Sequence, residues 1–155
     1  MKVLCCLDGT NTEQLSEAVS TMLRADDLTI GLIYVIDPGP HEELERHRER
    51  FLRPPHLAPQ RLDQIRQAEI ETAQEILQEG GRYFPNAEYL RREGRPEREI
   101  VQCAAEWGAD MIVISPRSPN TPGPPLGPKS VGHVARFVLD HTPCPVLLVR
   151  GHSNA

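Results

Sequence analysis

The chain has 155 residues, which suits one domain with its own core and is too short for two doubly wound domains. Hydrophobic residues make up 39% and charged residues 25%, an ordinary balance for a globular protein. The net charge of -5 argues against nucleic-acid or membrane-surface binding, and no apolar run approaches the roughly 20 residues of a membrane span, so we expect a cytoplasmic protein.

The first 37 residues predict a strand, a helix and a second strand. Residues 3–7 are an apolar run that ends at Asp8-Gly9-Thr10, and Thr10 has capping-box spacing to Glu13. The helix that follows carries its apolar residues on one face. These residues are Leu15, Val19, Met22 and Leu23. Residues 28–36, rich in β-branched side chains and closed by Asp37, predict the second buried strand.

Two proline-rich stretches, about 38–60 and 116–129, interrupt the pattern and predict loops. A helix is predicted at 62–77, ended by Gly80-Gly81, and a weak strand follows at 87–91. The next elements are a helix from Pro96 to Gly108 and an apolar strand at 111–114. The chain closes with a helix marked by Val131, Val134 and Val138 and a fifth strand at 145–149.

This alternation of strands and helices predicts one doubly wound α/β domain over residues 1–150, with 151–155 as a tail. The short apolar strands predict a mainly parallel five-stranded sheet with helices on both faces. In such sheets ligands bind beyond the carboxyl ends of the strands, where the strand order reverses. The loops after the first and fourth strands, at 8–10 and 115–130, are therefore the candidate site.

Four segments resemble the universal stress protein family, in the family's order along the chain. They are residues 3–10 (VLCCLDGT), 94–96 (GRP), 108–114 (GADMIVI) and 141–149 (HTPCPVLLV). The resemblance implies an adenine nucleotide ligand, ATP or AMP, with Mg²⁺ only alongside ATP. It places Asp8, with Gly9 and Thr10, beside the nucleoside and Val35 against the base. It also implies a homodimer paired through the last strand, from Val146 to Val149.

The chain departs from the glycine signature that nucleotide-binding members carry after the fourth strand. That signature is Gly, two residues, Gly, nine residues, then Gly followed by Ser or Thr. Ser115 and Ser118 stand at the first two glycines, Gly132-His133 stands at the last pair, and the loop between is four residues longer. Side chains at glycine positions can fill the space that a phosphate needs.

Residues 126–130 (LGPKS), directly before the last helix, offer an alternative anion site. Gly127 gives flexibility, Lys129 a positive charge and Ser130 a capping hydroxyl at the positive end of a helix. Arg117 would strengthen this site if it points inward, and Val134 bounds it on the helix. The simpler interpretation is that Ser130 is only an N-cap and Lys129 a solvated charge.

The remaining patterns favour binding over catalysis. Asp8 can be a turn or capping residue and Val35 a core residue, so each has a structural alternative. The chain has no Gly-x-Ser-x-Gly elbow, and His41 and His47 are six residues apart, which does not fit two metal ligands on one helix face. We expect a regulatory domain that binds a phosphate-bearing ligand in stress response. The alternative is a dimeric interaction module of the same fold without nucleotide.

Overall fold

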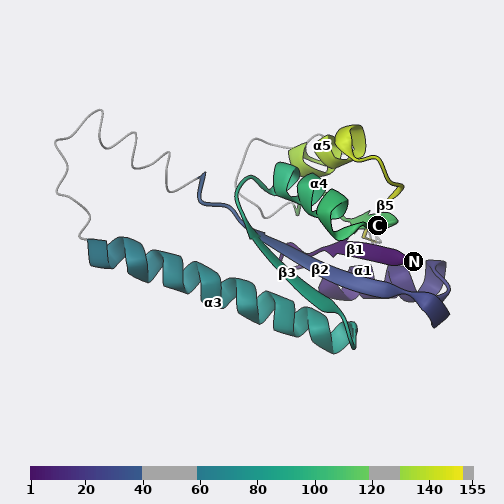
Figure 1. Cartoon of the computed structure of the whole chain (residues 1–155), viewed down its shortest axis with the longest axis horizontal. Helices are drawn as coiled ribbons and strands as arrows, with labels where there is room; N and C mark the ends of the chain where they lie inside the picture. Colours follow the sequence, from purple (N-terminus) through teal and green to yellow (C-terminus); the bar gives the residue numbers. More distant parts are fainter. Residues whose placement is uncertain (40–58, 119–129, 152–155) are drawn as a thin grey trace.

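The computed structural model describes residues 1–39, 59–118 and 130–151, in which strands and helices alternate (Figure 1). The strands are Lys2–Cys6 (β1), Thr29–Ile36 (β2), Glu88–Glu93 (β3), Met111–Ile114 (β4) and Val146–Leu148 (β5). The helices are Thr12–Met22 (α1), Pro59–Tyr83 (α3), Pro96–Trp107 (α4) and His133–His141 (α5), with a 3-10 turn at Ala25–Asp27 (η1). None of the described helices is long and apolar enough to cross a membrane.

All five strands are parallel and lie in the order β3-β2-β1-β4-β5, which confirms the predicted fold class. The chain builds the sheet outward from β1 to β3, then crosses back to add β4 on the other side of β1. β1 pairs with β4 through Val3↔Met111, Leu4↔Ile112 and Cys5↔Val113. The strand order therefore reverses between β1 and β4, and their carboxyl ends form the topological switch point of the sheet.

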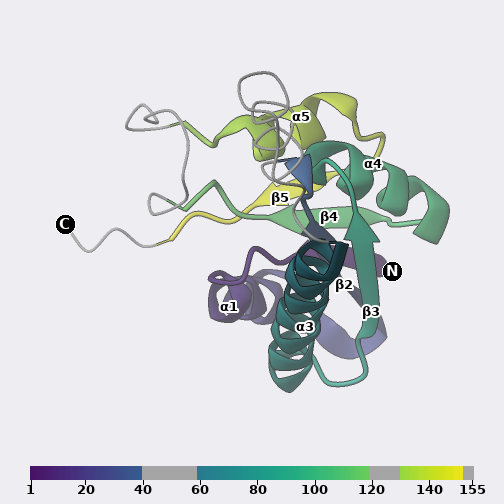
Figure 2. The same cartoon turned by 90° about the vertical axis from the view of Figure 1, so that its left-hand side faces the viewer.

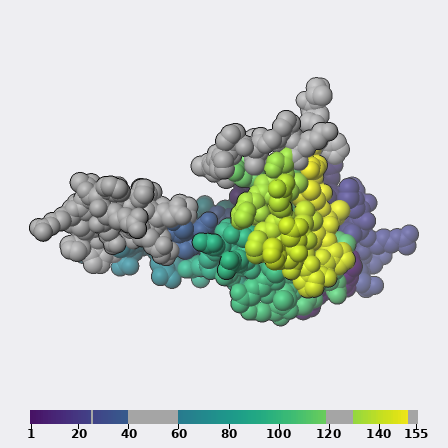
Figure 3. Space-filling model, turned by 90° about the horizontal axis from the view of Figure 1, so that it is seen from above, coloured from purple at the N-terminus to yellow at the C-terminus, as the bar shows by residue number. Residues whose placement is uncertain are grey.

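The helices form a layer on each face of the sheet (Figure 2). Helices α1 and α3 cover one face, where Val3, Cys5 and Leu7 point, and α4 and α5 cover the other, where Leu4 and Cys6 point. Seen from above, α4 and α5 lie against each other as one outer surface (Figure 3). Because successive side chains of a strand alternate between faces, the residues of β1 after Lys2 are apolar and buried on both sides of the sheet.

Helix α3 is longer than the sequence predicts, because Gly80 and Gly81 lie inside it and do not end it. A Cβ on Gly80 would lie 2.8 Å from Leu32 Cδ1 and 2.9 Å from Leu7 Cδ1. A Cβ on Gly81 would meet the hydroxyl of Tyr89. The two glycines therefore let the helix pack closely on the sheet. The amino-terminal part of α3 extends past the strands (Figure 1).

The predicted ends of α4 are confirmed, whereas the predicted buried face of α1 is wrong at Met22. Pro96 lies in the first turn of α4, and Gly108 ends the helix in the left-handed conformation with φ 76°, both as predicted. Met22, predicted on the buried face of α1, is 66% exposed, whereas Leu15 and Val19 are buried. The helix ends after Met22, and Leu23, in extended backbone, packs on the core instead.

Candidate ligand cleft at the switch point of the sheet

A cleft of about 330 Å³ opens at the carboxyl ends of β1, β2 and β4, where the reversal of strand order predicts a site. Its walls come from the turn after β1, the end of β2, the segment after β4 and the amino-terminal ends of α4 and α5. Its polar lining residues are Asp8, Asn11, Tyr34, Asp37, Ser115, Arg117, Ser118 and His133. Its apolar ones include Leu7, Ile33, Val35, Pro96, Ile100, Ile114, Val131 and Val134.

Asp8 organises the turn after β1. Its Oδ1 accepts hydrogen bonds from the Thr10 amide at 2.7 Å and the Thr10 hydroxyl at 2.9 Å. Thr10 does not cap α1, contrary to the capping-box prediction, because the helix begins one residue later, with Asn11 at the N-cap position. The interpretation of Asp8 as a turn residue is thus confirmed, and its carboxylate also lines the cleft.

Asn11, which no sequence pattern singled out, joins the two strands at the switch point. This side chain is 3% exposed. Its Oδ1 accepts a hydrogen bond from the Asp8 amide at 3.0 Å, and its Nδ2 donates to Cys6 O at 3.0 Å and Ser115 Oγ at 2.7 Å. Ser115, at the first glycine position of the family signature, is thereby tied to the end of β1.

Gly132 lies between the cleft residues Val131 and His133. It is the N-cap of α5, with φ 84°, and no side-chain hydrogen bond caps this helix. A Cβ at Gly132 would lie 2.8 Å from Arg117 Cβ, and the Arg117 amide donates to Val131 O at 3.1 Å. A glycine is therefore required here by both conformation and close approach. Its position supports the alignment of Gly132 with the last signature glycine.

Ser130 does not cap α5, so its interpretation as an N-cap is wrong. The helix starts at His133, and Ser130 Oγ accepts a hydrogen bond from the Gly132 amide at 3.3 Å, two residues on. Such local hydroxyl-to-amide bonds stabilise turns. The first residues of α5, His133 and Val134, face the cleft instead.

The structure brings together seven of the predicted site residues as cleft lining. They are Asp8, Val35, Ser115, Arg117, Ser118, His133 and Val134. Gly9, Thr10, Ser130 and Gly132 adjoin the cleft without lining it. Gly127 and Lys129 lie outside the described residues, as do His41 and His47. Asp37 was missed although it directly follows β2; its Oδ1 accepts a hydrogen bond from the Gly39 amide at 2.9 Å.

The thiols of Cys5, in the core, and Cys6, at the cleft, and the phenol of Tyr34 stay protonated at neutral pH. Burial raises the pKa of Cys5 to about 12, and burial together with neighbouring thiols raises the pKa of Cys6 well above its usual range. Burial, followed by the nearby carboxylates of Glu69 and Asp8, raises the pKa of Tyr34. Cys5 and Cys6 are free thiols and, being protonated, are poor nucleophiles. Among the described residues no cluster of His, Cys, Asp and Glu suits a metal ion.

A parallel sheet of this order, with a cleft at its switch point, defines a doubly wound α/β protein. The model of the universal stress protein family matches residues 1–150, and the chain belongs to that family. It is 29% identical over 149 residues to a universal stress protein of Thermus aquaticus encoded in a QAH/OAS sulfhydrylase 3' region. That alignment covers 96% of this chain and 97% of the relative.

Two solved universal stress proteins share the fold. The Arabidopsis thaliana protein with AMP bound superimposes with a TM-score of 0.63 at 15% identity, covering 99% of this chain and 94% of that one. The Archaeoglobus fulgidus protein in complex with dAMP gives a TM-score of 0.59 at 18% identity, covering 96% and 97% of the two chains. At these identities the likeness establishes the shared fold alone.

Proposed function

We propose that this chain is a regulatory domain that binds an adenine nucleotide, AMP or ATP, in the switch-point cleft during stress response. The observation that carries the proposal is the cleft itself, whose 330 Å³ falls within the usual size range of small-molecule sites. Membership of the family supports it, as do the relatives solved with AMP and dAMP. The imidazole of His133 leaves the cleft open, because this side chain is 77% exposed.

In this proposal the two sides of the cleft bind different parts of the ligand. Arg117 and the amino-terminal end of α5 hold the phosphate, because a guanidinium and a positive helix end both attract anions. Asp8 accepts hydrogen bonds from the ribose hydroxyls, and Val35 packs against the base. Lys129 helps to hold the phosphate, and Mg²⁺ takes part only with ATP.

Titration calorimetry with AMP, ATP and cyclic AMP tests this proposal. The wild-type protein should bind at least one of them, and Arg117→Ala should weaken binding roughly tenfold or more, since a hydrogen bond to a charged group contributes about 1.5–3 kcal/mol. Asp8→Ala and Lys129→Ala should each weaken it as well. Arg82→Ala is the matched control, because Arg82 is an exposed cation in the last turn of α3. No binding by the wild type would reject the proposal.

The second candidate is a cytoplasmic dimeric interaction module that has lost nucleotide binding. One observation favours it: β5 is an edge strand, and Val146, Leu147 and Leu148 all remain half-exposed. Edge strands of this kind pair readily with a second chain. Absorbance and mass spectrometry of protein purified from cells discriminate the two functions, because only the first predicts a copurified nucleotide. A dimer in size-exclusion chromatography is compatible with both.

A further inference from the structure

A carboxylate stands directly behind one wall of the cleft. Glu97 lies in the first turn of α4, between the cleft residues Pro96 and Ile100, and its side chain is only 10% exposed. Its Oε1 is 3.4 Å from Nε2 of His133, the first residue of α5 and itself part of the lining. A Ser or Thr hydroxyl, the side chain of the family signature at this position, is too short to repeat the contact that the imidazole makes.

In the part of the chain that the structure describes, the charges around the cleft are mostly negative. Among the residues that the structure describes, the charged side chains lining it are Asp8, Asp37 and Arg117, with His133 as the one imidazole. Glu97 adds a third carboxylate immediately behind the wall. One guanidinium and a helix end can balance a single phosphate group. A ligand with several phosphate charges meets a growing repulsion, which is stronger in a partly buried site than in water.

We propose that Glu97, acting through His133, restricts the cleft to nucleotides with one phosphate group and disfavours triphosphates. This inference rests on the proposed nucleotide binding and names the residues that select the ligand by charge. The imidazole holds the carboxylate at the phosphate end of the cleft and partly shields it. Glu97 is thus a specificity-determining residue that does not itself line the site.

Removing the charge of Glu97 while keeping its shape tests the proposal. Affinities for AMP, cyclic AMP and ATP are measured by calorimetry in the presence of EDTA, so that no metal neutralises the triphosphate. The wild type should bind AMP about tenfold or more tightly than ATP. Glu97→Gln should raise ATP affinity about fivefold and cyclic AMP affinity by less than about twofold, because the repulsion scales with ligand charge. The control is Glu99→Gln, which removes a charge that faces Arg92.

The outcomes separate the two proposals. If the wild type binds no nucleotide, the proposed function fails and this inference fails with it. If AMP binds but Glu97→Gln leaves the AMP-to-ATP ratio unchanged, or Glu99→Gln changes it equally, only this inference fails. His133→Ala provides a second variant at an exposed position that does not threaten folding. Loss of its shielding should lower ATP affinity more than AMP affinity, and an unchanged ratio would contradict the proposal.

Discussion

Asn11 links the ends of the two strands that meet at the cleft. It is a buried amide whose hydrogen bonds reach both strands at the switch point. Asn11→Ala should lower the free energy of unfolding by about 2 kcal/mol or more, because buried partners lose their hydrogen bonds. Urea unfolding measures this change. Ser20→Ala, at an exposed position of the same helix, should stay within about 0.5 kcal/mol, and an equal loss in both variants would contradict the prediction.

Gly132 combines a positive φ with a close contact, whereas Gly108 has a positive φ and no such contact. At Gly108, with φ 76°, an added Cβ would meet nothing beyond its chain neighbours within 4 Å, whereas a Cβ at Gly132 would collide with Arg117. Gly108→Ala should cost about 1–2 kcal/mol from backbone strain alone. Gly132→Ala should cost more and should also weaken AMP binding. Thermal unfolding and calorimetry of both variants check this, and equal costs would show that the contact with Arg117 is unimportant.

The residues of the cleft were predictable to different degrees. Asp8 and Ser115 follow directly from their places at strand ends. Asn11 did not, because its partner Ser115 is 104 residues away and no local pattern marks such a contact. Glu97 was hidden for the same reason, since its significance comes from His133 on another helix. Sequence position locates the cleft, but long-range side-chain contacts decide its polarity.

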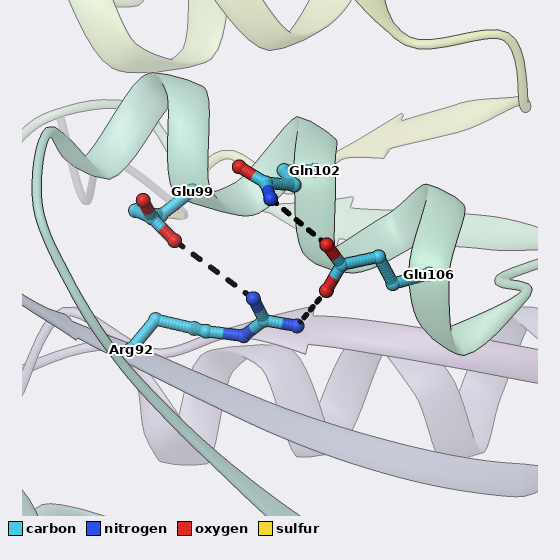
Figure 4. Close-up of polar contacts among 4 residues, drawn as sticks. All are labelled: Arg92, Glu99, Gln102 and Glu106. Atoms are coloured by element: carbon cyan, nitrogen blue, oxygen red, sulfur yellow. Dashed lines mark hydrogen bonds and ion pairs between the residues drawn. The ribbon is translucent and has the colours of Figure 1, made fainter.

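At the level of elements, β3 is held to α4 by a small ionic network (Figure 4). Arg92 on β3 donates to Glu106 and faces Glu99, and Gln102 also donates to Glu106. The hydrogen bond from Arg92, followed by that from Gln102, lowers the pKa of Glu106 below its ordinary value of 4.5. The Glu106 side chain is 50% exposed, so its contribution is small and salt-dependent.

This network predicts a pH dependence with a definite sign. Because the folded pKa of Glu106 lies below the unfolded one, its stabilisation is complete above about 4.5 and is lost as the pH falls through the folded value. Glu106→Gln should therefore be slightly less stable than the wild type at pH 7, and the difference should shrink at pH 3. Urea unfolding at both pH values in low salt measures it. A difference that grows on acidification would contradict the assignment.

Helix ends illustrate where element-level prediction succeeds and fails. Gly108 ends α4 in the left-handed conformation. Glycine adopts this conformation easily, so the residue type alone predicts the helix end. Gly80 and Gly81 carry the same local signal inside α3, but the close approach of Leu32 and Tyr89 determines their role instead. Tertiary packing thus overrides a local preference that costs only about 1 kcal/mol per glycine.

For the whole molecule, the fold was predictable because its pattern is redundant. Four mainly apolar strands and one polar strand, β3, alternate with amphipathic helices, and pairing with β2 fixes the weak strand β3. The ligand preference has no such redundancy. In our proposal it depends on the few charges that surround one cleft, so a single substitution such as His133→Ser should change it without altering the fold.

Binding of AMP in the cleft should stabilise the whole folded chain. A ligand that binds only the folded state at 100 times its dissociation constant stabilises that state by about 2.7 kcal/mol. For a chain of 155 residues, AMP should then raise the melting temperature by about 5–10 °C. Differential scanning fluorimetry measures the shift, with adenosine and inorganic phosphate as separate controls that should each give less. Because binding in the cleft joins the segment after β4 to α5, Arg117→Ala should abolish most of the shift. Equal shifts in both proteins would place the nucleotide elsewhere on the chain.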